Sequence, residues 1–88
     1  MRVEIREKVR STANEDGGVL LDLEQGKYFS LNGMGAEIWK KLQAGATLSD
    51  IQDHLQATYA APPERIRQDL QRFVQRLQEM GVVVVSAS

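Results

Sequence analysis

Two β-prone runs joined by a short loop constrain the fold of this chain more than any other feature. The first run is Val19–Leu23 and the second is Lys27–Leu31, and the loop between them ends in Gly26. A three-residue loop that closes on glycine is typical of a β-hairpin with a bulge, because glycine adopts the left-handed backbone conformation at no steric cost. We therefore expect a hairpin over residues 19–31.

Alternation along the two runs predicts which side chains share a face of this hairpin. Pairing across a three-residue loop sets Leu21 and Leu23 on the same side as Phe29. The full expected set on that face is Val19, Leu21, Leu23, Phe29 and Leu31, and the opposite face carries Leu20, Asp22, Tyr28 and Ser30.

Three segments after the hairpin have the apolar spacing of α-helices. The first ends at Gly45, and the second begins at Thr47, with Asp50 in the position of a capping box. Pro62 and Pro63 separate the second helix from the third. The apolar positions are Met34, Ile38, Trp39 and Leu42, then Leu48, Ile51 and Leu55, then Ile66, Leu70, Phe73, Leu77 and Met80.

The two ends of the chain are expected to add short strands. Val3 and Ile5 alternate with charged residues, and Val9 extends the pattern. The run Val82–Val85 is β-branched and would be sticky if exposed, so it is expected to pair back as a strand. The sequence thus predicts a single α+β domain over 1–88. Its fold is winged-helix-like, with a small antiparallel N-terminal β-sheet of about three strands followed by three α-helices.

Composition excludes several classes of protein. The 88 residues contain no cysteine, which excludes disulfides, thiolate metal sites and thiol nucleophiles. A small domain without such cross-links points to a reducing compartment, so a cytoplasmic location is expected. No run of the sequence approaches the roughly 20 apolar residues of a membrane helix, and the first residues do not resemble a signal peptide.

Residue types suited to catalysis are sparse. His54 is the single histidine, and it is expected on the surface of the second helix without partners. Asp50 and Asp53 lie three residues apart, but two carboxylates without a further ligand make a poor metal site. The sequence therefore predicts no catalytic residue, no metal and no cofactor, and hence a protein that is not an enzyme.

A winged-helix DNA-binding protein is an alternative, because the third helix carries several arginines that could face a groove of DNA. Acidic residues interleave with these arginines, however, and the formal net charge is −1. The connection Thr58–Pro63 is also longer than the turn of a helix-turn-helix motif. These features favour a solvated helix face with ion pairs, and no nucleic-acid or membrane partner is expected.

An open sheet edge supports a peptide-binding interpretation. If Lys27–Leu31 ends the sheet, its backbone groups can pair with an added strand, and Lys27 is its only charge. On the third helix, Val74 lies at the border of the apolar stripe beside Arg67 and Gln71. This position suits the wall of a half-exposed groove, although periodicity alone favours a Val74 that widens the contact with the core.

Motifs spread over about Val19–Val83 resemble the PqqD family, whose members serve as recognition domains for ribosomally made, post-translationally modified peptides. The matching residues are Leu21-Asp22-Leu23, Gly26-Lys27-Tyr28-Phe29, Leu31-Asn32, Gly35-Ala36, Ile38-Trp39, Leu42, Gly45, Thr47, Ile51, Asp69-Leu70, Phe73-Val74, Leu77 and Gly81-Val82-Val83. Each piece also has a packing or turn explanation, but their order and spacing span about three quarters of the chain.

Within that family, the sequence motifs around Tyr28-Phe29 and Ile38-Trp39 are most similar to those of the stand-alone recognition proteins of lasso peptide biosynthesis. The resemblance implies that a precursor leader peptide pairs antiparallel to the strand at 27–31, lies against the third helix, and is presented to a separate leader peptidase or other modifying enzyme. The implied peptide-binding residues are Lys27, Tyr28, Phe29, Ser30, Leu31, Arg67, Leu70, Gln71, Val74 and Leu77. The family also contains a peptide chaperone for a radical SAM enzyme of pyrroloquinoline quinone assembly, which is the second alternative.

Overall fold

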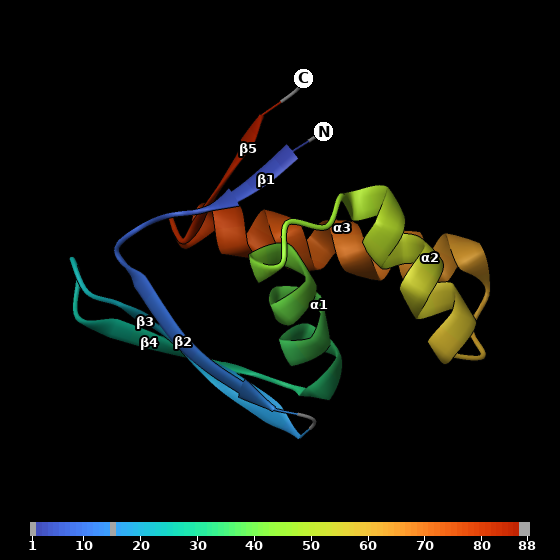
Figure 1. Ribbon diagram of the computed structural model, residues 1–88, viewed down its shortest axis with the longest axis horizontal. Coiled ribbons are helices and arrows are strands. Elements are labelled where there is room, and N and C mark those ends of the chain that lie inside the picture. Colours follow the sequence, from blue (N-terminus) through green and yellow to red (C-terminus); the bar gives the residue numbers. More distant parts are fainter. Residues whose placement is uncertain (1, 15, 87–88) are drawn as a thin grey trace.

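The computed structural model describes residues 2–14 and 16–86, and within them five strands and three helices form an α+β fold (Figure 1). The strands are β1 (Arg2–Ile5), β2 (Val9–Asn14), β3 (Gly17–Asp22), β4 (Lys27–Leu31) and β5 (Val83–Ser86), and the helices are α1 (Gly33–Gln43), α2 (Leu48–Thr58) and α3 (Pro63–Glu79). This architecture confirms the predicted fold class and the three predicted helices.

The strands form two antiparallel sheets rather than one. One sheet has the order β2-β3-β4, and the other is a two-stranded ribbon of β1 and β5. The expected pairing of the C-terminal valine run is confirmed, because β5 pairs with β1. The alternating segment expected as one first strand is divided at Arg6–Lys8, so Val9 belongs to a different sheet from Val3 and Ile5.

The faces predicted for the β3–β4 hairpin are wrong by one residue. Leu20 pairs with Phe29 and Leu21 pairs with Tyr28, so β4 is displaced by one position from the expected register. Such a displacement turns every side chain of one strand to the other face. Leu20 is therefore buried in the core, while Val19 and Leu21 face outward.

Asp22 explains this register. Its Oδ1 atom accepts hydrogen bonds from the backbone N–H groups of Glu24 and Gln25, at 3.0 and 3.1 Å. Its Oδ2 atom lies 3.0 Å from Nζ of Lys8 in a nearly inaccessible ion pair. The loop consequently spans the four residues after Asp22 instead of three, and closes at Gly26 with a φ of 69°.

Side-chain caps set the starts of the first two helices. The side chain of Asn32 accepts a hydrogen bond from the N–H of Gly35 at the start of α1. Thr47 and Asp50 form the predicted capping box of α2, with each side chain accepting from the other's backbone N–H. Pro63 occupies the first turn of α3, where its missing N–H costs no helical hydrogen bond.

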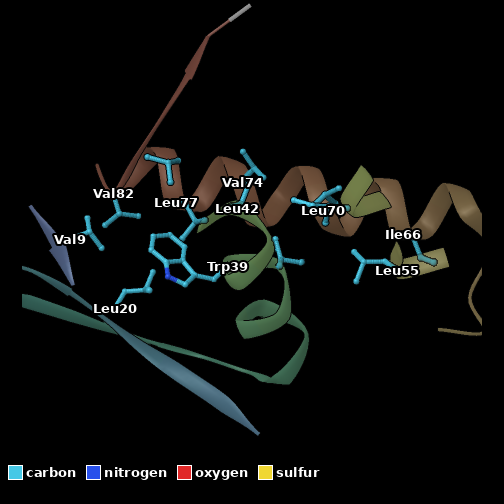
Figure 2. Packing of buried hydrophobic residues seen from close by; sticks show 13 residues of the cluster. Val9, Leu20, Trp39, Leu42, Leu55, Ile66, Leu70, Val74, Leu77 and Val82 are labelled. Carbon is cyan, nitrogen blue, oxygen red and sulfur yellow. The ribbon is translucent and has the colours of Figure 1, made fainter. Parts of the chain in front are cut away.

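One apolar core joins the three helices to the β2-β3-β4 sheet. Figure 2 shows Trp39 of α1 among Leu20, Leu42 and Leu77. All of these side chains are buried. The core therefore holds β3, α1 and α3 at fixed positions relative to one another, and this fixes where the exposed sheet edge lies.

Candidate functional site

β4 forms an edge of the three-stranded sheet, as the peptide-binding interpretation requires. The phase of the hydrogen bonds shows which backbone groups are free. Leu23 N donates to Lys8 O at 2.9 Å, which makes Lys8 and Leu23 a hydrogen-bonded pair. Because such pairs alternate with non-hydrogen-bonded ones, Leu20 and Asp22 must direct their backbone groups toward β4.

The same alternation then identifies the free groups of β4. Phe29 lies opposite Leu20, and its N–H and C=O groups form hydrogen bonds with β3. The N–H and C=O groups of Tyr28 and Ser30 point away from the sheet, and no hydrogen bond reaches them from residues 2–14 or 16–86. The edge therefore offers two donors and two acceptors at alternate residues, which is the pattern that an added strand requires.

α3 turns its Phe73 side toward the end of this edge. α1 begins at Gly33, two residues after β4 ends, and a Cβ atom on Gly35 would lie only 3.0 Å from Cε1 of Phe73. The glycine at this position thus lets the Phe73 ring lie against the first turn of α1. Phe73, Met34 and Leu31 are all half-buried apolar residues packed against the core. Leu31 ends β4, Met34 lies in the first turn of α1, and Phe73 lies against that turn, so we call these three residues the apolar ledge.

The structure places three of the predicted helix residues in the core. Leu70, Val74 and Leu77 are all buried, with Val74 only 5% exposed. The expectation that Val74 borders a half-exposed groove is therefore wrong, and the alternative, in which Val74 widens the contact with the core, holds. Val74 belongs to the buried apolar cluster that also contains Leu42 and Leu77.

The remaining predicted helix residues lie apart from β4. Arg67 and Gln71 are exposed and line a hollow whose other walls are β1 and the connection between α1 and α2. No residue of β4 lines this hollow, and the joint role predicted for β4, Arg67 and Gln71 stays a prediction. Periodicity alone gave no means of choosing between the two borders of α3, because both carry polar residues next to the same apolar stripe.

The outer face of the β2-β3-β4 sheet is unusually apolar. Val19, Leu21 and Tyr28 lie on it, and Tyr28 is 72% exposed. The register found in the structure, rather than the predicted one, brings these side chains to solvent. This face adjoins the free edge of β4, since Tyr28 contributes both its exposed ring and its free backbone groups.

The sequence did not predict a hydrogen-bonded network that joins Glu37 of α1 to His54 of α2 and to Tyr59. Nε2 of His54 lies 2.5 Å from Oε1 of Glu37, and the hydroxyl of Tyr59 donates to Oε2 of Glu37 at 3.0 Å. The expectation that His54 is without partners is therefore wrong. The bonds from His54 and Tyr59 outweigh burial and hold the pKa of Glu37 below its ordinary value, and the bond to Glu37 raises the pKa of Tyr59.

Replacing Tyr59 by phenylalanine is expected to cost about 1 kcal/mol of stability at pH 7, because a hydrogen bond to a charged carboxylate is lost. Since the pKa of Glu37 is lowered in the folded protein, its contribution is present above its unfolded pKa and is lost as the pH falls through the folded value. Urea unfolding of both proteins at pH 7 and pH 3 should show the difference shrinking in acid. A difference that stays constant would contradict a charge-dependent role for Tyr59.

The described residues contain no cluster of three or more potential metal ligands among histidine, cysteine, aspartate and glutamate side chains. Within residues 2–14 and 16–86, no helix combines the length and apolarity needed to span a membrane. The chemistry that the edge of β4 offers is hydrogen bonding by a free backbone beside an apolar ledge, which is suited to holding an extended chain.

Comparison with known proteins agrees with this geometry. The sequence model of the PqqD family, described as coenzyme PQQ synthesis protein D, matches residues 17–83. A comparison with curated proteins found no match. The solved structure of TbiB1 in complex with the TbiA(beta) leader peptide is 30% identical with a TM-score of 0.89, covering 97% of this chain and 99% of that one.

A second solved structure, lasso peptide synthetase B1 complexed with the leader peptide, is 26% identical with a TM-score of 0.87. The match covers 97% of this chain and 100% of that one. These similarities extend over nearly the whole chain, including the hairpin and the three helices, and confirm the resemblance seen in the sequence motifs. The chain belongs to the PqqD family.

Proposed function

We propose that this chain binds the leader segment of a ribosomally synthesised precursor peptide by β-strand addition and presents it to a separate leader peptidase or modifying enzyme of lasso peptide biosynthesis. The observation that carries the proposal is the free edge of β4, where the backbone groups of Tyr28 and Ser30 point outward. Two similar chains solved with leader peptides support it. In this proposal the protein acts by binding, and the chemistry on the precursor belongs to the partner enzyme.

The leader lies antiparallel to β4 in this proposal. Two pairs of backbone hydrogen bonds, to Tyr28 and Ser30, supply affinity that is independent of the leader's side chains. Lys27, Phe29 and Leu31 contribute through their side chains and through the ladder to β3 that keeps β4 straight. A disordered leader loses conformational entropy when it becomes a strand, and these bonds together with apolar contacts offset that loss.

On α3, the leader meets the side of the helix that carries Phe73. The half-buried Phe73 ring lies against Gly35 in the first turn of α1, just after β4, and can take an apolar leader side chain. Leu70, Val74 and Leu77 support this side of the helix from within the core. Arg67 and Gln71 lie at the other border of α3 and make no direct contact with the leader in this arrangement.

The chain functions as one recognition domain over 1–88, and its lack of cysteine suits a reducing cytoplasm. Binding of the leader raises the effective concentration of the precursor near a partner enzyme that holds this chain. Recognition of the leader and chemistry on the precursor are thereby divided between two proteins.

Fluorescence anisotropy with a labelled synthetic leader from the neighbouring precursor gene tests the proposal. We expect saturable binding with a Kd between roughly micromolar and nanomolar, equivalent to about 8–12 kcal/mol. A scrambled leader of the same composition should not bind. Absence of binding both with and without the partner peptidase would refute leader recognition.

Replacing Ser30 by proline tests strand addition directly. The N–H of Ser30 points away from β3, so proline removes a donor to the leader while leaving the β3–β4 ladder in place. We expect leader affinity to fall by about tenfold or more, since a backbone hydrogen bond and the close approach of the leader are both lost. The measurement is the same anisotropy titration, at equal melting temperature.

Ala13→Pro provides a matched control on the opposite edge. Ala13 lies on β2 and also directs its N–H away from the sheet, because it forms a non-hydrogen-bonded pair with Gly18. This change should carry a similar cost in stability and leave leader affinity unchanged. If Ala13→Pro weakens the leader as much as Ser30→Pro does, the leader does not pair with β4.

A further inference from the structure

The ribbon of β1 and β5 has two open edges. It consists of only two strands, and Figure 1 shows it projecting from the body of the molecule, with the described ends of both strands at its tip. An isolated two-stranded ribbon is marginally stable in water, and a third strand is normally needed for independent stability. An exposed edge of this kind is a template for pairing with another strand.

The backbone groups available on β1 can be assigned from one hydrogen bond. Arg6 N donates to Val82 O at 3.0 Å, in phase with the β1–β5 register. Arg2 and Glu4 therefore direct their backbone groups toward β5, and Val3 and Ile5 direct theirs outward. No hydrogen bond from the described residues reaches the outward N–H and C=O groups of Val3.

The space beside this edge is open. A hollow of about 1130 Å³ lies along β1, between the ribbon, the connection from α1 to α2, and α3. Its lining includes the apolar side chains of Leu42, Leu48 and Leu70. The structure thus leaves room for a strand next to β1, with apolar groups available to the side chains that such a strand would bring.

The charges on β1 are complementary to those of a second copy of β1. Nε of Arg2 lies 3.5 Å from Oε1 of Glu4, and both side chains are largely exposed on the same face. If two copies pair antiparallel about Val3, Arg2 of each copy lies opposite Glu4 of the other. Like charges would meet only if the register were shifted, so the pattern Arg2-Val3-Glu4 also specifies one register.

We propose that two copies of this chain associate through antiparallel pairing of β1 with β1, centred on Val3. The outward N–H and C=O groups of the two Val3 residues bond to each other, and the two ribbons become one four-stranded sheet of order β5-β1-β1-β5. The interface is isologous, so it closes as a dimer and does not propagate. The outer edge of β5 is the poorer candidate because none of its residues is charged and nothing on it selects a register.

The pairing leaves the edge of β4 free, because β4 belongs to the other sheet. A dimer therefore carries two leader-binding edges. The association concerns only β1 and does not depend on the proposed leader recognition, so each proposal can fail without the other.

Sedimentation velocity of the purified chain over concentrations from about 1 to 500 µM tests the dimer, since a small interface of this kind gives weak affinity. We expect the average mass to rise from monomer toward dimer. Arg2→Glu and Glu4→Arg should each remain monomeric, because like charges then face each other across the pair. An equimolar mixture of these two variants should form a heterodimer, and the double variant R2E/E4R should again self-associate.

Val3→Pro separates backbone pairing from charge. The N–H of Val3 is not used in the β1–β5 ribbon, so this variant should keep its fold and lose self-association. Monomeric wild-type protein at every concentration would overturn the proposal. Self-association that persists in Val3→Pro, or that is unchanged in Arg2→Glu and Glu4→Arg, would overturn it as well.

Discussion

Trp39→Ala is expected to lower the free energy of unfolding by about 3–5 kcal/mol, because a fully buried aromatic side chain is replaced by a cavity. Trp39 is completely inaccessible to solvent. It lies where β3, α1 and α3 meet, among Leu20, Leu42 and Leu77 (Figure 2). Urea unfolding followed by far-UV circular dichroism measures the loss.

Trp39→Phe provides the control for this prediction. Among the residues that the structure describes, none accepts a hydrogen bond from Nε1 of Trp39, so phenylalanine removes a buried donor that is not satisfied. The loss should therefore be clearly smaller than for alanine, even though volume is also removed. Equal losses for the two variants would mean that the indole is held by an interaction other than packing. Leader affinity should fall with Trp39→Ala as well, because the same contacts fix α3 relative to β4.

Asp22→Ala is expected to lower the melting temperature by roughly 10 °C or more, since it leaves the ammonium of Lys8 without its partner in a largely inaccessible position. The variant also removes the acceptor of the N–H groups of Glu24 and Gln25, which define the hairpin loop. Both effects act on the β3–β4 hairpin, so leader binding to β4 should weaken too. Differential scanning calorimetry and the anisotropy titration measure the two results.

Asp22→Asn distinguishes the two roles of this side chain. The amide oxygen can still accept from the loop, but the charge is lost, so the variant should fall between wild type and Asp22→Ala. Burial raises the pKa of Asp22, yet Lys8 and the backbone N–H groups of Gln25 and Glu24 outweigh it and keep the pKa below its ordinary value. The stabilisation is consequently present above the unfolded pKa and disappears as the pH falls through the folded one. Asp22→Ala should thus become less harmful in acid, and an unchanged effect at pH 3 would contradict the ion pair.

Local signals in the sequence were sufficient for most of the fold. The capping box at Thr47 and Asp50, the proline break before α3 and the terminal valine strand all depend on neighbouring residues or on strong composition. The hairpin was predicted, but its faces were not. Its register depends on Lys8, which lies fourteen positions before Asp22, and such a distant charge partner is invisible to alternation along the strand.

The candidate site was only partly predictable for a similar reason. The edge strand at 27–31 follows from the order of local elements, and the structure places it at a free edge. The side of α3 that approaches this edge depends on Gly35, whose missing side chain admits the Phe73 ring. Glu37, the shared partner of His54 and Tyr59, likewise lies on α1, and sequence spacing does not show that it meets these two residues of a later segment.

The spacing of the free backbone groups on β4 restricts the registers in which an added strand can pair with this edge. Only alternate residues, Tyr28 and Ser30, offer hydrogen bonds outward, so a docked chain can slide only in steps of two residues, about 6.8 Å. A displacement by one residue would turn the opposite set of side chains toward α3. Within a segment that pairs with β4, loss of two residues can restore the match, whereas loss of one cannot. An edge of this kind therefore distinguishes even from odd changes in the length of the paired segment.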